Sequence, residues 1–195
     1  MLKVFLAEDE IVMREGIKNN IDWQGEGFEF VGDAGDGELA YPIIQKTRPD
    51  ILITDIKMPF MDGLELSELV KKEFPKIKII ILSGYNEFDY AKQAIHIGVT
   101  DYLLKPITAS KLLEAVKKVA DVIEKEREEE GMLERYRLEM AENTVLERQR
   151  LFRDLVTSRI NFKEALERGE ELGLELSASF YQLMLFKLMP VGSAV

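Results

Sequence analysis

Short apolar runs that are typical of β-strands alternate with segments that are typical of helices, five times from residue 2 to about residue 108. This alternation limits the possible folds more than any other feature of the sequence. The strand-type runs cover residues 2–7, 28–34, 51–54, 77–82 and 101–104. The helix-type segments cover residues 11–20, 38–47, 64–74, a stretch that ends near 97, and one that begins near 108. The pattern predicts an α/β fold, a doubly wound five-stranded parallel sheet with helices on both faces and right-handed crossovers. In the first helix we expect Ile11, Val12 and Ile17 on the inner side.

Polar side chains stand where four of these runs end. Glu8 and Asp9 follow the first run, Asp55 ends the third, Ser83 follows the fourth and Lys105 follows the fifth. A lone aspartate at such a place usually caps a turn. Because the carboxyl ends of parallel strands meet at one edge of the sheet, we expect these five side chains to converge there. The sequence therefore predicts a chemical site at this edge.

Composition excludes several classes of protein. The chain has 195 residues, with 46% hydrophobic and 32% charged residues, which is typical of a globular protein with room for one domain and an appendage. The formal net charge of −10 argues against a nucleic-acid surface within these residues. With no cysteine, disulfides and thiolate metal sites are excluded. The early acidic residues and the lack of a long apolar run predict a cytoplasmic protein without membrane contact.

Four motifs, in order and at suitable intervals, carry a family resemblance. They are Glu8-Asp9, the run from Asp55 to Gly63, Ser83-Gly84-Tyr85, and the run from Tyr102 to Pro106. With them, residues 2 to about 122 resemble the receiver domain of two-component response regulators, the CheY-like fold. The resemblance implies the strand order 2-1-3-4-5.

The resemblance also implies that Asp55 accepts a phosphoryl group from a sensor histidine kinase. The crowded carboxylates of Glu8, Asp9 and Asp55 suit a hard divalent cation, and Mg²⁺ is the expected cofactor because it bridges carboxylates and phosphate oxygens. By resemblance Asp9 and Asp55 are direct ligands, Glu8 acts mostly through water, and Lys57 contributes its backbone carbonyl. Transfer then needs mainly alignment and charge stabilisation.

Other residues take their expected roles from the same family. Lys105 stabilises the incoming phosphoryl oxygens, and the peptide bond before Pro106 is a candidate cis bond. Ser83 also contacts the phosphoryl group and forms a switch pair with Tyr102, which turns inward behind it. The resulting change reaches the surface made by the fourth helix, the fifth strand and the fifth helix.

Two further expectations concern residues around this constellation. Lys57 and Tyr85 lie where the family tunes the rate of self-dephosphorylation, which we expect to be slow but finite. His96, the only histidine, stands on a predicted helix without metal-ligand company, so we expect a structural or surface role for it.

Beyond residue 122 the chain is strongly helical. We expect one long helix, or two nearly continuous ones, over residues 108–160, reaching on the order of 80 Å. Its apolar positions approximate a 3-4 spacing that Arg148 interrupts, and they are Leu138, Ala141, Val145, Phe152 and Leu155. A helix of this length needs a partner, and the simplest arrangement that supplies one is a parallel homodimeric coiled coil. A helix that folds back as an antiparallel hairpin is the alternative, with a possible break at Gly131.

The expected organisation is a receiver domain over 1–122, a helical coiled-coil linker over 123–160, and the incomplete start of a second domain over 161–195. In the last part, residues 180–189 look like a single strand, which cannot form a sheet alone. Receivers of similar sequence often precede an AraC-type helix-turn-helix, so by analogy we expect a transcriptional regulator whose DNA-binding part is missing here.

Two rival functions stay open at this point. One is a receiver-fold interaction scaffold that phosphorylation does not control. The other is a phosphatase of doubly wound fold, which would want a second carboxylate soon after the nucleophile, where this chain has Lys57. We expect no enzyme activity beyond slow self-dephosphorylation.

Overall fold

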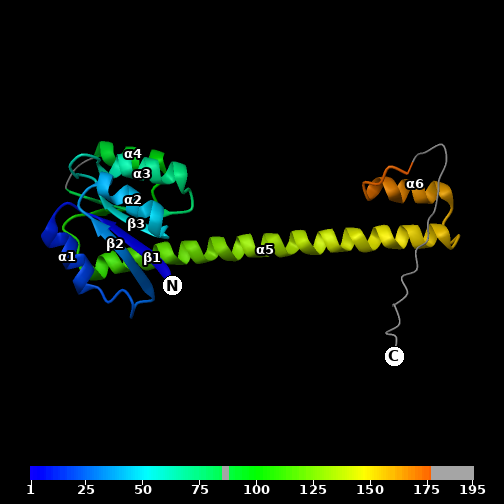
Figure 1. The fold of residues 1–195 in the computed structure, drawn as a ribbon, viewed down its shortest axis with the longest axis horizontal. Helices are drawn as coiled ribbons and strands as arrows, with labels where there is room; N and C mark the ends of the chain where they lie inside the picture. The colour runs from blue at the N-terminus through cyan, green and yellow to red at the C-terminus, as the bar shows by residue number, and fades with distance from the viewer. Residues whose placement is uncertain (85–87, 177–195) are drawn as a thin grey trace, which may run out of the picture. The chain divides into compact units, whose positions relative to one another are not determined.

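The computed structural model describes residues 1–84 and 88–176 (Figure 1). It divides into two compact units, residues 1–129 and the residues from 130 onward, which are described separately. The predictions for Tyr85 and for a strand over 180–189 lie outside the described residues.

The first unit is built on a five-stranded parallel sheet with the order β2-β1-β3-β4-β5, which confirms the predicted topology. Its strands are β1 (Leu2–Ala7), β2 (Phe28–Ala34), β3 (Ile51–Asp55), β4 (Lys78–Ser83) and β5 (Asp101–Leu104). Side chains alternate between the two faces of a strand, so Leu6 and Ile53 face one core and Phe5 and Leu52 the other. Strands buried on both faces explain the continuous apolar runs of the sequence.

Five helices cover the two faces of this sheet. They are α1 (Ile11–Asn20), α2 (Gly37–Thr47), α3 (Gly63–Glu73), α4 (Phe88–Ile97) and the first part of α5 (Ala109–Val156). Figure 1 shows α2, α3 and α4 together on one side of the sheet, and Ile44, Val70 and Ala94 join the core on that side. Helices α1 and α5 cover the other side through Ile17 and Leu112.

The expected inner face of α1 was partly wrong. Ile17 is buried, but Ile11 is 66% exposed and Val12 is 80% exposed. A helix turns by about 100° per residue, so both side chains point more than about 100° away from Ile17. The inner row of α1 is instead formed by Met13 and Ile17, one turn apart, and Ile21 continues it beyond the helix.

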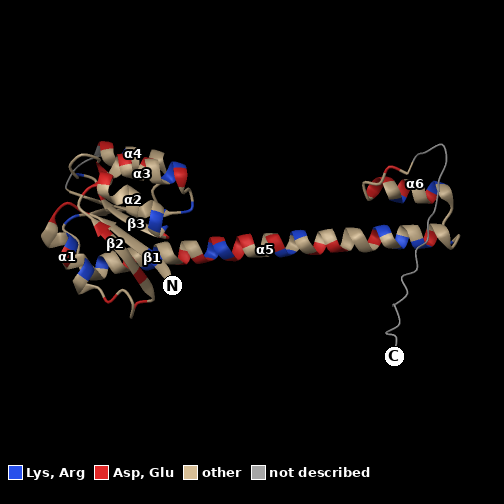
Figure 2. Cartoon of the chain, in the orientation of Figure 1, with Lys and Arg blue, Asp and Glu red and all other residues tan. Residues whose placement is uncertain are grey.

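Helix α5 is fastened to the first unit as far as Arg127. A buried apolar row begins at Leu112 and ends at Ile123. Beyond it, Arg127 pairs with Asp50 at 2.5 Å, and Glu126 pairs with Lys78 at 2.6 Å. Asp50 and Lys78 stand at the N-terminal ends of β3 and β4, so the pairs lie at the edge of the sheet opposite the predicted site. Figure 2 shows both signs of charge interspersed along α5.

In the second unit α5 continues through Gly131 without the break that we considered, and it ends at Val156. Helix α6 (Phe162–Glu171) follows and is capped by the Asn161 side chain, which accepts from the Glu164 N–H at 2.9 Å. Arg168 of α6 lies 3.7 Å from Asp154, and the Arg148 guanidinium donates to the Leu172 carbonyl. The chain therefore does fold back, but only after Val156.

The loop between β3 and α3 is tied closely to Asp55. The Gly63 N–H donates to the Ile56 carbonyl at 2.9 Å, and the Asp62 side chain caps α3. A Cβ atom at Gly63 would lie 1.8 Å from the Asp55 carbonyl oxygen. Residue 63 must therefore be glycine for this loop to pass so near the strand end.

We predict that Gly63→Ala destabilises the first unit by about 3 kcal/mol, because the added methyl group overlaps the backbone of Asp55. Gly16→Ala is the matched control. Its Cβ would meet nothing nearer than 3.8 Å within α1, and alanine in a helix should add about 0.5 kcal/mol. Urea unfolding followed by the fluorescence of Trp23, which is buried in this unit, measures both. Equal stability of the two variants would contradict the prediction.

Candidate functional site

Three carboxylates meet where β1 and β3 end side by side. Ala7 and Thr54 are register partners, which brings the next residues of both strands together. Oxygens of Glu8, Asp9 and Asp55 all lie within 4.8 Å of one another. Glu8 is fully buried and Asp55 is 6% exposed, while Asp9 opens to solvent. The structure thus gathers the predicted acidic cluster, with one accessible member.

Lys105 closes the cluster from the end of β5. Its Nζ lies 2.9 Å from Glu8 Oε2 and 2.9 Å from Asp55 Oδ2, and 3.1 Å from Glu8 Oε1. The Lys105 N–H donates to the Ser83 carbonyl at 2.6 Å, which fixes the lysine against β4. The peptide bond between Lys105 and Pro106 is cis.

Charge in this cluster is imperfectly balanced. Burial raises the pKa of both Glu8 and Asp55, and the repulsion between neighbouring carboxylates adds to the rise, although Lys105 opposes it. Burial alone would lower the pKa of Lys105, but its hydrogen bonds to Asp55 and Glu8 outweigh burial and raise it. Three carboxylates around one ammonium leave an excess of two negative charges.

The predicted switch residues occupy neighbouring strands. Ser83 is buried at the end of β4, and its hydroxyl donates to the Gly84 carbonyl at 3.1 Å. Tyr102 of β5 pairs in register with Ile81 and is half-buried against the core shared by α2, α3 and α4. Ser83 therefore lies at the same edge of the sheet as the carboxylates. Tyr102 lies two residues before Leu104, the register partner of Ser83, and so stands further from that edge.

The remaining predicted residues lie further out. Lys57 has an exposed side chain just beyond β3. His96 is exposed on α4, where it lines an open groove with residues of α3 and α4. His96 is not a member of the carboxylate cluster that the described residues form.

Two positioning groups were missed by the sequence analysis. Arg14 Nη1 donates to the Glu8 carbonyl at 2.6 Å, and its Nε lies 3.2 Å from Asp33 Oδ2. The Ile56 N–H donates to Asp55 Oδ1 at 2.8 Å, which fixes that carboxylate. The contact of Arg14 could be suspected, because this arginine stands about one turn into the helix that follows Glu8. The contact of the Ile56 N–H is a backbone contact without a sequence signal.

The donor set fits a small divalent cation. Its ligand atoms are carboxylate oxygens, which hard cations prefer, and one of the carboxylates, Asp9, is exposed to solvent. The cluster also has an excess of two negative charges, which a divalent cation would balance. Both oxygens of Glu8 accept from Lys105, and those of Asp55 accept from the Ile56 N–H and from Lys105. The exposed Asp9 is therefore the carboxylate best placed for direct ligation. The cluster can therefore hold a hard cation next to a carboxylate that is itself fixed by a backbone N–H.

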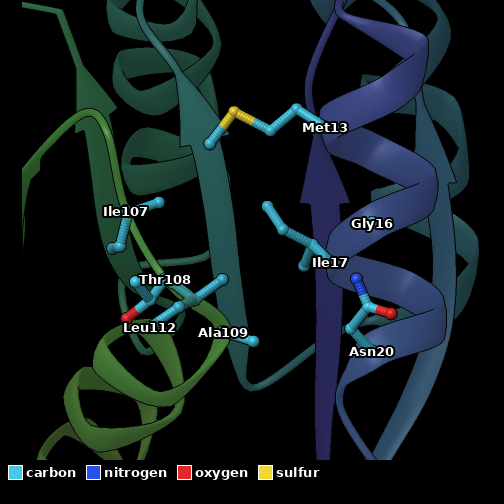
Figure 3. Close-up of a pocket in the computed structure, with 8 residues that line it drawn as sticks. All are labelled: Met13, Gly16, Ile17, Asn20, Ile107, Thr108, Ala109 and Leu112. Carbon is cyan, nitrogen blue, oxygen red and sulfur yellow. The ribbon is translucent and has the colours of Figure 1, made fainter.

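A mostly apolar hollow of about 170 Å³ lies between α1 and the start of α5 (Figure 3). Figure 3 shows Met13 and Ile17 of α1 on one side, with Ile107 and Leu112 on the other. Both walls follow the site residues closely in the chain, since Met13 comes soon after Asp9 and Ile107 soon after Lys105.

No helix among residues 1–84 and 88–176 is long and apolar enough to cross a membrane.

A five-stranded doubly wound sheet with an acidic cluster and a lysine at its carboxyl edge defines the class of the protein. The model of the response regulator receiver domain matches residues 4–117, and the chain belongs to this family. The transcriptional regulatory protein YesN of Bacillus subtilis is 41% identical over 119 residues, which cover 61% of this chain and 32% of YesN. DegU of Brevibacillus brevis is 34% identical over 61% of this chain and 50% of its own length.

Solved structures give the same result for the first unit. The receiver domain of AraT, a response regulator from Geobacillus stearothermophilus, matches with a TM-score of 0.61 and 43% identity. This match covers 65% of the present chain and 98% of that one. A two-component transcriptional regulator AraC from Clostridium phytofermentans matches with a TM-score of 0.58 and 31% identity, over 66% of this chain and 99% of that one. The chain spans about a third to a half of the length of the curated relatives YesN and DegU.

We predict that, in a chelating buffer, the contribution of Glu8 and Asp55 to the free energy of unfolding falls as the pH rises above about 4, the ordinary range of a carboxyl group. In this range the folded chain holds protons on Glu8 and Asp55 that the unfolded chain has already lost, because both pKa values are raised on folding. Asp55→Asn removes one of these groups, so its stability should fall less steeply with pH.

Urea unfolding at a series of pH values measures both slopes. The exposed Glu68→Gln is the control and should keep the wild-type slope. Parallel curves for the wild type and Asp55→Asn would refute this assignment of the buried charge.

Proposed function

We propose that this chain is the regulatory part of a phosphorylation-controlled transcriptional response regulator, with Asp55 as the phosphoacceptor. One observation carries the proposal: the Lys105 ammonium lies 2.9 Å from the Asp55 carboxylate, inside a cluster that still holds an excess of negative charge. A purely structural ion pair would need only one carboxylate. The arrangement instead offers a nucleophile, a fixed cation and room for a second cation at one strand edge.

In the proposed reaction, an Asp55 carboxylate oxygen attacks the phosphorus of a phosphohistidine on a sensor histidine kinase. The new O–P bond forms as the N–P bond breaks, and the imidazole leaves with the bonding electron pair. The Ile56 N–H holds Oδ1 of Asp55, and Lys105 faces Oδ2, so the carboxylate is oriented before the donor arrives. Lys105 then balances the charge of the phosphoryl oxygens.

Mg²⁺ is the proposed cofactor, held by Asp9 and Asp55 with the Lys57 backbone carbonyl, and by Glu8 through water. When bound it supplies positive charge beside the phosphoryl oxygens. The chain's own contribution is to keep Glu8 on Lys105, which leaves Asp9 available, and to anchor the Glu8 backbone through Arg14. Second-layer contacts of this kind commonly alter metal affinity about 10-fold or more.

The proposed switch uses Ser83 and Tyr102. The Ser83 hydroxyl now donates to its neighbour Gly84, and this weak local bond can be exchanged for one to a phosphoryl oxygen. Tyr102 is half-buried on the next strand and can then pack more deeply. Lys57, with Tyr85, would tune the hydrolysis that resets the site.

The kinase has a suitable surface next to the site. Ile11 and Val12, which we wrongly expected in the core, are exposed at the start of α1, two and three residues after Asp9. The hollow of Figure 3 lies between the following turns of α1 and the start of α5. A helix of the kinase that packs here would bring its phosphohistidine near Asp55.

The output is proposed from the relatives. YesN and DegU are transcriptional regulatory proteins and extend well beyond the length matched here. We infer a cytoplasmic regulator in which a further domain binds DNA, and a homodimer formed through the helix of residues 108–160.

We predict that a small phosphodonor with Mg²⁺ adds the mass of one phosphoryl group to the wild-type chain and none to Asp55→Asn. Asp62→Asn is the matched control, since Asp62 follows the same strand but caps α3 through its side chain. It should be phosphorylated like the wild type. Chelation of Mg²⁺ should suppress the mass gain.

Intact-mass spectrometry gives the answer directly. No mass gain in the wild type would favour the alternative function, a receiver-fold scaffold that phosphorylation does not control. Continued turnover of a chromogenic phosphate ester would instead indicate a phosphatase.

A further inference from the structure

The second unit exposes apolar side chains at a spacing of seven residues along α5. Leu138 is 57% exposed, Val145 53% and Phe152 43%. Ala141 lies on the same side of the helix, between Leu138 and Val145. The stripe thus has one large apolar residue in every two turns, and burying such side chains against a partner is favourable.

Helix α6 does not cover this stripe, because it packs on a neighbouring face of α5. There Leu151 of α5 and Ala165 of α6 are buried, and Arg168 of α6 lies 3.9 Å from Glu147. Arg148, which interrupts the apolar pattern in the sequence, donates to the Leu172 carbonyl at 2.7 Å. Its guanidinium is therefore engaged by the α6 side of the unit.

The seven-residue spacing distinguishes this stripe from the other exposed apolar residues. Leu133 and Met140 are also seven apart, but the next two positions of that row are Glu147 and Asp154. A seven-residue repeat corresponds to 3.5 residues per turn, close to the 3.6 of an α-helix, and it keeps a row of side chains facing a partner helix over several turns. The row through Leu138, Val145 and Phe152 is the one that keeps apolar residues in three successive repeats.

The charges beside the stripe favour a second copy of the same helix in parallel. If Leu138 takes the first core position of a heptad, Arg137 lies on one flank of the seam and Glu142 on the other. In a parallel pair in register, Arg137 of one copy faces Glu142 of the second copy, and the reverse pair forms by symmetry. Neither side chain is buried within its own chain.

We propose that two copies of this chain associate through a parallel seam formed by Leu138, Ala141, Val145 and Phe152, with α6 beside the seam. This deepens the dimer of the proposed function by naming its contact residues and orientation. The seam does not require phosphorylation. The test of the seam can therefore fail although Asp55 is phosphorylated, and the test of Asp55 can fail although the seam forms.

Single-cysteine variants test the seam cleanly, because the 195-residue chain contains no cysteine. We would prepare Leu138→Cys, Val145→Cys and Phe152→Cys in the full chain, without phosphodonor. Leu146→Cys is the matched control, since Leu146 is 50% exposed on α5 but points away from the stripe. Disulfide-linked dimers are counted after mild oxidation, and circular dichroism checks the helix content of each variant.

We expect rapid cross-linking at positions 138, 145 and 152, at least about 10-fold faster than at position 146, because a core position faces its own counterpart in a parallel pair. Cross-linking at 145 alone would reveal antiparallel helices and overturn the proposal. Equal rates at 145 and 146, or no cross-linking at any position, would overturn it as well.

Discussion

The bonds from the Lys105 ammonium to Glu8 and Asp55 are the contacts on which the site depends. They join the ends of β1, β3 and β5, so three strands must be in register for them to form. Two buried carboxylates would repel each other and resist burial without this cation. The lysine only partly compensates them, since the pKa of both carboxyl groups stays raised by burial. In the proposed function, this residual imbalance is what favours a further cation beside Asp55.

The backbone around the cluster makes the arrangement rigid. Arg14 fixes the Glu8 carbonyl, the Ile56 N–H fixes Asp55, and the Lys105 N–H bonds to the Ser83 carbonyl. Gly63 allows the following loop to pass against Asp55. By contrast, the Ser83 hydroxyl bonds only its neighbour Gly84 among the described contacts, and Tyr102 is half-buried. The residues fixed by these contacts suit a role in positioning.

Most of the first unit could be predicted from the sequence because its signals are local or periodic. Apolar runs with turn residues located the strands, and polar residues at the strand ends located Glu8, Asp55 and Lys105. The strand order came from a family resemblance, since periodicity cannot order strands in a sheet. The inner face of α1 was misjudged because apolar character alone was weighed, whereas the helical angle turns Ile11 and Val12 to solvent. Arg14 and the Ile56 N–H were missed because each acts through backbone geometry.

The helical region shows the same division between local and long-range information. Residues with a high helix propensity allowed α5 to be predicted from the sequence. The position at which the chain folds back, after Val156, depends on contacts between α5 and α6 that only the structure shows. Those contacts also account for Arg148, which looked like a defect in the apolar pattern. Once it is assigned to the α6 side, the regular row through Leu138, Val145 and Phe152 becomes visible.

The central claim is that Asp55 itself carries the phosphoryl group. The most direct measurement is borohydride reduction of the chain after treatment with phosphodonor and Mg²⁺, followed by mass spectrometry of its peptides. Reduction converts an aspartyl phosphate to homoserine, so we expect homoserine at position 55 and at no other aspartate. Homoserine at position 9, or unmodified aspartate throughout, would contradict it.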